Sequence, residues 1–290
     1  MSPDLLTQSR ATNSLVALRG VGRRFASGVT ALDGVDLDIH RGEFLSLLGP
    51  SGCGKSTLLR IIAGLSEPSS GIRRLRLATN RAGHIPAGRI GFVFQDPTLM
   101  PWSTVTANVL LPLRLAGRVG PAERRRVATE IGSVGLAGFE RAYPRQLSGG
   151  MRMRVSIARA LVTDPDLLLL DEPFAALDEI TRMALNDDLM RLWDNRRPTV
   201  VFVTHSVFES AYLSTRIAVM TPRPGRIVAE VPVDLPQPRE RALRTSARYP
   251  RPASPHRNPP PHAGEGMVGA ALRDAGESAE RSEAGEGGAS

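Results

Sequence analysis

The chain has 290 residues and a formal net charge of +8, with 41% hydrophobic but only 4% aromatic residues. The hydrophobic share is enough for a buried core, and no segment reaches the roughly 18 consecutive apolar residues of a membrane-spanning helix. A single cysteine excludes an internal disulfide and a cysteine-based metal cluster.

Arginine supplies almost all of the positive charge. Of the 37 basic residues, Lys55 is the only lysine. The arginines occur in short groups, such as residues 124–126, and few aromatic rings are present to stack on bases. We therefore expect no nucleic-acid partner. Residues 1–20 also lack the basic start and apolar run of a signal peptide, so none is expected.

The first predicted elements surround a glycine-rich segment. Residues 31–39 alternate apolar and polar side chains, which predicts a half-exposed strand, and residues 43–48 form a short apolar run. A helix is predicted from Lys55, and Gly64 is placed to end it. Its buried stripe is formed by Leu58, Leu59, Ile61 and Ile62.

The later elements continue this alternation of strands and helices. Pro121 opens a predicted helix that runs through about Gly132. Buried strands are predicted at residues 90–94, 167–170, 199–203 and 217–220. Because helical patterns separate the strands, we expect the α/β fold class with a largely parallel sheet.

The glycine-rich segment matches the complete pattern of a phosphate-binding loop, and its place between a strand and a helix favours that interpretation over a chance glycine-rich turn. Its glycines allow backbone N–H groups to surround phosphate oxygens at a helix N-terminus. Lys55 is predicted to neutralise the β- and γ-phosphates, because a compact ammonium fits this loop and a planar guanidinium does not. The Ser56 hydroxyl is predicted to help hold magnesium. The predicted ATP-binding residues of the loop are Gly49, Pro50, Ser51, Gly52, Cys53, Gly54, Lys55, Ser56 and Thr57.

Two carboxylates follow the apolar run at 167–170. A buried strand would hold Asp171 rigidly at the magnesium shell. Glu172 is one residue further and can orient and polarise an attacking water as a general base. Two solvated acids at the end of a core strand are a common alternative. The pairing with the phosphate-binding loop favours the catalytic interpretation.

Residues 147–154, with the sequence LSGGMRMR, resemble the signature sequence of the ABC ATPases. Further motifs follow in the order of that family, over about residues 15–236. Phe25 is similar to the aromatic residue that stacks on adenine, and is expected before the first strands. Gln95 matches the glutamine-loop residue, Asp178 ends the D-loop motif, and His205 matches the switch histidine.

The resemblance implies a P-loop NTPase fold of the ABC ATPase type. Its mainly parallel core sheet is joined by an antiparallel β subdomain and a helical subdomain. The ATPase domain is expected at 15–236, after an N-terminal extension at 1–14. Residues 237–290 are expected to be a disordered tail, because proline and glycine replace large apolar side chains there. A genuine extension and a shifted reading frame would both produce such a tail.

The resemblance also implies roles for individual residues. Ser148, Gly149 and Gly150 precede a predicted helix and form an anion site. In the family this site faces the γ-phosphate held by a second chain, so hydrolysis needs a head-to-tail homodimer. Gln95 would join Ser56 and Asp171 around Mg²⁺ and sense a partner, and His205 would contact the γ-phosphate. Two departures are Met153, where glutamine is common, and Ser206, where aspartate is common.

Two segments, 94–102 and 221–227, are similar to the ATPases of nitrate, sulfonate and taurine importers. The implied function is ATP hydrolysis that energises uptake of a small solute, with nitrate, sulfonate or a related compound as candidates. The implied partners are membrane permease subunits and, indirectly, a solute-binding protein, and the implied location is the cytoplasmic face of the inner membrane.

Two other functions remain to be weighed. A soluble ABC ATPase acting on DNA or ribosomes usually carries coiled-coil insertions, zinc modules or tandem nucleotide domains, and none is evident. A non-catalytic, nucleotide-gated subunit would need a broken site, yet Lys55, Asp171, Glu172 and His205 are all present.

Overall fold

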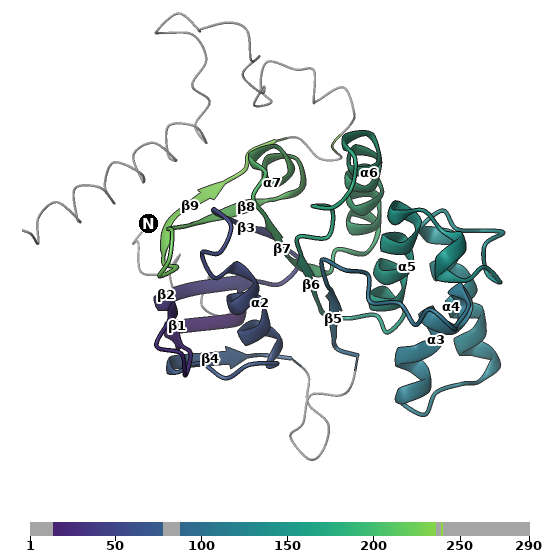
Figure 1. Ribbon diagram of the computed structural model, residues 1–290, viewed down its shortest axis with the longest axis horizontal. Helices are drawn as coiled ribbons and strands as arrows, with labels where there is room; N and C mark the ends of the chain where they lie inside the picture. Colours follow the sequence, from purple (N-terminus) through teal and green to yellow (C-terminus); the bar gives the residue numbers. More distant parts are fainter. Residues whose placement is uncertain (1–13, 78–87, 236–238, 240–290) are drawn as a thin grey trace, which may run out of the picture.

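The computed structural model describes residues 14–77, 88–235 and 239 (Figure 1). Nine strands form two sheets in these ranges. A three-stranded antiparallel sheet has the order β2-β1-β4, and a six-stranded sheet has the order β5-β6-β7-β3-β8-β9. The strands are β1 (Ser14–Arg24), β2 (Thr30–His40), β3 (Phe44–Leu48), β4 (Ser70–Leu75), β5 (Ile90–Val93), β6 (Leu167–Asp171), β7 (Thr199–Thr204), β8 (Arg216–Met220) and β9 (Ile227–Pro232).

The larger sheet is parallel except at one edge. β5, β6, β7, β3 and β8 pair in parallel, and only β9 is antiparallel to its neighbour. Every residue of β3, β6 and β7 is buried, as expected for strands covered on both faces. Their side chains alternate between two cores. Leu167 and Leu169 face one core, and Leu168 and Leu170 face the other.

Helix α2 (Lys55–Ala63) packs between the two sheets (Figure 1). Leu58, Leu59, Ile61 and Ile62 are fully buried in the core that also contains apolar residues of β1, β2 and β3. Gly64 caps the helix in the left-handed conformation. The predicted start, buried stripe and end of this helix are therefore confirmed.

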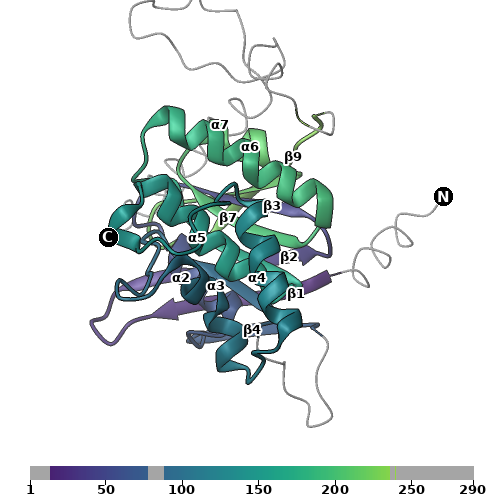
Figure 2. The same cartoon turned by 90° about the vertical axis from the view of Figure 1, so that its right-hand side faces the viewer.

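The other helices cover the second core. Figure 2 faces the helical subdomain, which α3, α4 and α5 build in front of the sheet. Buried Asn108 ties α3 to the preceding turn, because its amide donates to the Ser103 carbonyl and accepts from Met100 N. The helices are α3 (Val105–Leu115), α4 (Pro121–Ser133), α5 (Gly149–Leu161), α6 (Glu179–Arg196) and α7 (Val207–Leu213), with the short 3₁₀ helix η1 (Pro144–Gln146).

The terminal segments fall largely outside the described residues. Ser14, in the expected N-terminal extension, already belongs to β1. Within the expected tail only Arg239 is described. It is buried, and its guanidinium donates to carbonyl oxygens of Ala211 and Tyr212 and, at 2.5 Å, to that of Ser214. None of the described helices is both long and apolar enough to span a bilayer.

Candidate functional site

The phosphate-binding loop joins β3 to α2 at the carboxyl edge of the parallel strands. Gly54 is the N-cap of α2, has φ +105°, and has no side chain that could bond the amides of the first turn. A Cβ at this position would lie 2.7 Å from the Ala31 carbonyl oxygen, so only glycine fits. The first-turn amides are therefore not capped by a side chain at position 54 and can bind an anion.

Lys55 lies inside the loop. Its side chain is 3% exposed, and Nζ donates to the Gly49 and Pro50 carbonyl oxygens at 2.8 Å each. Nζ is also 3.5 Å from Glu172 Oε1. The ammonium is therefore fixed between the loop and the carboxylate that follows β6.

Ser56 and Asp171 are in direct contact. The Ser56 hydroxyl donates to Asp171 Oδ1 at 2.7 Å. Burial raises the pKa of Asp171, against the lowering effect of that hydrogen bond. A hydroxyl beside a buried carboxylate is a hard oxygen pair that fits Mg²⁺. The described residues contain no cluster of three His, Cys, Asp or Glu side chains that could hold a metal ion by themselves.

Glu172 lies between a cation and an imidazole. Its backbone has φ +44°, in the left-handed region that non-glycine residues rarely adopt, and its N–H donates to the Val203 carbonyl at 3.1 Å. Oε2 is 3.3 Å from His205 Nδ1, while Oε1 is the atom near Lys55. The ends of β6 and β7 thus bring together two residues 33 positions apart.

A cavity of about 350 Å³ adjoins the loop. Phe25, Glu172 and Arg223 are among the residues that line it. Phe25 is 41% exposed, and the Arg23 guanidinium carbon lies 5.3 Å from its ring centroid. The lining residues are Phe25, Ser27, Val29, Ala31, Gly52, Gly54, Lys55, Ser56, Thr57, Glu172 and Arg223.

The prediction that Phe25 precedes the first strands was wrong. It follows β1 and lies in the turn to β2, where its N–H donates to the Val29 carbonyl at 2.9 Å. The first strand was missed because its two central residues, Arg19 and Gly20, are exposed and interrupt the alternation. Phe25 in this turn nevertheless lines the cavity.

Arg223 is a cavity residue that the motifs did not predict. It belongs to the loop between β8 and β9, and its Nε and Nη2 donate to the Gly52 carbonyl at 3.2 and 3.1 Å. The available signal was the similarity of residues 221–227 to importer ATPases. That similarity pointed to a subfamily rather than to a side chain in this cavity.

Gln95 is not brought into the cavity. It follows β5, is exposed, and makes no side-chain hydrogen bond within the described part of the chain. Four predicted residues of the phosphate-binding loop also do not line the cavity: Gly49, Pro50, Ser51 and Cys53. Cys53 is 1% exposed and packs into the core with α2, which agrees with its interpretation as a non-nucleophilic loop residue.

The signature and D-loop residues lie at helix starts away from this cavity. Ser148 caps α5 by accepting from Met151 N at 3.2 Å, and Gly149 and Gly150 form its first turn. Asp178 caps α6, and the hydrogen bond from Thr181 N lowers the pKa of its carboxyl. None of these residues lines the cavity of its own chain.

The two family departures have local explanations. Met153 is 2% exposed and packs in the core of the helical subdomain. Ser206 caps α7 by accepting from Glu209 N at 3.3 Å. Serine and aspartate are both good N-caps, so Ser206 preserves this local interaction.

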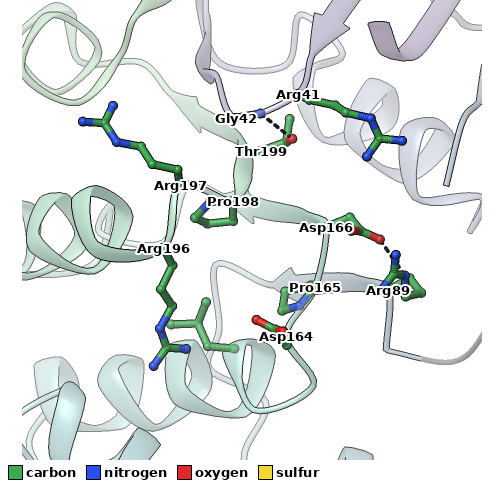
Figure 3. A pocket seen from close by; sticks show the side chains of 11 residues that line it. Arg41, Gly42, Arg89, Asp164, Pro165, Asp166, Arg196, Arg197, Pro198 and Thr199 are labelled. Carbon is green, nitrogen blue, oxygen red and sulfur yellow. Dashed lines mark hydrogen bonds and ion pairs between the residues drawn. The ribbon is translucent and has the colours of Figure 1, made fainter. Parts of the chain in front are cut away.

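A second cavity, of about 270 Å³, lies at the amino ends of β6 and β7 (Figure 3). Four arginines line it, but Figure 3 shows their guanidinium groups pointing in different directions. Three of them already pair with carboxylates: Arg89 with Asp166, Arg196 with Glu130 and Arg197 with Asp194. This cavity is therefore not a convergent phosphate site.

Sequence comparison identifies relatives of the chain. The ABC transporter family model matches residues 32–175. An ABC transporter ATP-binding protein of Methanocaldococcus jannaschii, MJ0412, is 52% identical over 73% of this chain and 79% of its own length. The aliphatic sulfonates import ATP-binding protein SsuB of Bacillus licheniformis is 49% identical over 73% of this chain and 81% of its own length.

Solved structures agree with these relatives. The dimeric ABC transporter cassette MJ0796 is 35% identical, with a TM-score of 0.66 over 75% of this chain and 98% of its own. The same cassette bound to ADP and Pi in a post-hydrolysis state has a TM-score of 0.65 with the same coverage. The predicted fold class is confirmed, and the chain belongs to the ATP-binding, ATP-hydrolysing subunits of the ABC transporter family.

Proposed function

We propose that this ATPase is the energising subunit of a membrane importer for a small solute. The observation that carries the hydrolytic part is the grouping of Lys55, Glu172 and His205 beside the phosphate-binding loop. The import part is supported by relatives such as SsuB, whose name specifies aliphatic sulfonates. Sulfonate, nitrate or a related compound is the solute class to test.

The phosphate-binding loop would hold ATP through its backbone N–H groups. Lys55 Nζ would exchange carbonyl partners for β- and γ-phosphate oxygens. Phe25, which lines the cavity, would stack on adenine. Ser56 and Asp171 would hold Mg²⁺, with Gln95 reaching the same shell when the chain closes on ATP. The bound cation supplies charge neutralisation on the phosphates.

Glu172 would act as the general base. Its carboxylate accepts a proton from water as the water oxygen attacks the γ-phosphorus, and the bond to the β,γ-bridging oxygen breaks to release ADP. His205 is positioned to hold the γ-phosphate or the attacking water. The fixed backbone of Glu172 at the end of β6 would keep the carboxylate oriented during this step.

The signature residues would act across a homodimer. Ser148, Gly149 and Gly150 stand at the start of α5, outside their own cavity, with helix amides oriented for an anion. A head-to-tail dimer would place them against the γ-phosphate of the second chain, with Asp178 at the same interface. The dimeric structure of MJ0796 supports this arrangement.

Membrane permease subunits would be the transport partners, and a solute-binding protein would act indirectly. Trp102 is 76% exposed on the segment that follows Gln95, and so large an exposed aromatic side chain suits a protein contact. Such a contact would link the nucleotide site to the permease. It would hold the subunit peripherally at the cytoplasmic face of the inner membrane.

Substitution of Glu172 by Gln tests the hydrolytic role. The variant should bind ATP and dimerise but lose at least about 100-fold in phosphate release, because the base is removed while the shape is kept. Phosphate release and size-exclusion chromatography with ATP measure the two properties. Full turnover would refute the assignment. In vesicles carrying the co-purified permease, uptake of radiolabelled sulfonate or nitrate should stop with the same variant.

A further inference from the structure

The loop between β8 and β9 forms part of the cavity wall. Gly225 N donates to the Ala31 carbonyl at 2.9 Å, and a Cβ on Gly225 would lie 2.1 Å from the Cys53 carbonyl oxygen. The loop is therefore wedged between β2 and the phosphate-binding loop. Arg223 projects from it to Gly52 and is among the residues that line the cavity.

Arg223 lines the same cavity as the residues proposed to bind the nucleotide, which include Phe25 for adenine and Lys55 for the β- and γ-phosphates. Arg223 is bonded to Gly52 of the phosphate-binding loop, and the loop that carries Arg223 is bonded to Ala31, which also lines the cavity. Because Lys55 is assigned to the β- and γ-phosphates, the α-phosphate is the one that still lacks a side-chain cation.

The Arg223 guanidinium has N–H groups that can still donate to a ligand. Two of its roughly five N–H groups are used on the Gly52 carbonyl, and no described carboxylate pairs with it. Arg226, three residues further on, instead pairs with Asp33. An exposed guanidinium with spare donors at the edge of a phosphate site can bond phosphate oxygens in a fork geometry.

We propose that Arg223 is a further nucleotide-binding residue, whose guanidinium donates to the α-phosphate. The inference rests on the proposed ATP site and adds a second side-chain cation to it. Lys55 serves the β- and γ-phosphates, and Arg223 serves the phosphate next to the sugar. Binding of ADP should therefore depend on Arg223 as strongly as binding of ATP does.

Calorimetric titration of the dimer-forming full chain with ATP, ADP, AMP and adenosine tests this. Arg223→Ala should raise the Kd of ATP, ADP and AMP by a similar factor of about tenfold and leave adenosine unchanged. Arg223→Lys should keep part of the affinity, because the charge remains. Wild-type failure to bind ATP would instead refute the nucleotide site itself.

Matched variants distinguish a direct contact between Arg223 and phosphate from a general effect of lost positive charge in the loop. Arg226→Ala removes the same charge from the same loop and should leave every Kd within about twofold. Arg223→Gln keeps an amide donor for the Gly52 carbonyl but removes the charge, and should lose affinity like Arg223→Ala. The proposal is overturned if Arg223→Gln binds like wild type, if Arg226→Ala is equally impaired, or if only ATP binding weakens.

Discussion

Lys55 is the residue at which the size of the charged group matters most. Nζ fits between two backbone carbonyl oxygens at 2.8 Å, in a side chain that is 3% exposed. A guanidinium carries the same charge but needs a wider, planar space. In a chain whose other basic residues are all arginine, this is the position at which arginine is absent.

Substitution of Lys55 by Arg should therefore reduce ATP affinity or turnover by at least about tenfold, despite the conserved charge. Fluorescent ATP-analogue binding and phosphate release measure the two effects. Arg60→Lys, a swap on the exposed side of α2, is the control and should stay near wild-type activity. Full activity of Lys55→Arg would refute the argument from shape.

At the residue scale, the sequence could predict the residues whose spacing is fixed by local chemistry. The loop residues, Asp171 and Glu172 adjoin strand ends, so a strand pattern is enough to place them. Arg223 could not be placed in this way. Its position depends on the contacts of Gly225 with Ala31 and Cys53, which join segments far apart in sequence.

At the element scale, α7 shows how a buried carboxylate is held beside the switch histidine. Glu209 accepts a hydrogen bond from the Thr204 hydroxyl, directly before His205, and lies 3.8 Å from Arg182 Nε on α6. The Arg182 guanidinium also donates to the Leu177 carbonyl at 2.9 Å, within the D-loop motif. One pair of side chains thus connects the D-loop to the switch segment.

Burial raises the pKa of Glu209, and this determines the sign of a pH effect. The folded chain holds that proton more tightly than the unfolded chain, so the associated stability is present at acidic pH. It is lost as pH rises from the ordinary glutamate range through the raised pKa. Glu209→Gln should remove this loss. Its free energy of unfolding in urea, relative to wild type, should increase with pH.

A Glu67→Gln variant is the control, because that side chain is exposed on the turn before β4. If the Glu209→Gln difference changes with pH no more than the Glu67→Gln difference does, Glu209 does not carry the titration. A second variant, Glu209→Asp, shortens the side chain and should weaken the link to Thr204 while it keeps the charge.

Helices and strands whose apolar residues are continuous or regularly spaced could be predicted from the sequence, and the other elements could not. α2 and the fully buried strands β3, β6 and β7 could be predicted because burial dictates nearly every residue in them. β4 was not found, because its residues are exposed or half-buried and show no alternation. Such edge elements are defined by their pairing partners. β4, for example, follows the register of β1.

At the scale of the whole molecule, the proposed active site belongs to two chains. In the head-to-tail dimer, each site would combine Lys55 of one chain with Ser148 of the other. A mixed dimer of Lys55→Arg and Ser148→Arg chains would then carry one doubly altered site and one intact site. If both residues served a site within one chain, both sites would remain altered.

Mixing these two variants in a Glu172→Gln background should therefore restore trapping of about one ATP per dimer. Each variant alone should trap almost none. Differently tagged chains, purified in tandem and assayed for retained radiolabelled ATP, measure this recovery. The absence of any recovery in verified mixed dimers would contradict the composite site.

Gly54 and Gly225 limit which mutations the domain can tolerate. Gly54 and Gly225 come from opposite ends of the domain, yet side-chain atoms on them would collide with Ala31 and Cys53 carbonyl oxygens. The three segments therefore meet backbone against backbone, with no flexible side chain to absorb an insertion. In a saturation library selected for transport, both positions should tolerate no replacement. Homologues engineered with a longer β8–β9 loop would have to rebuild the phosphate-binding loop as well.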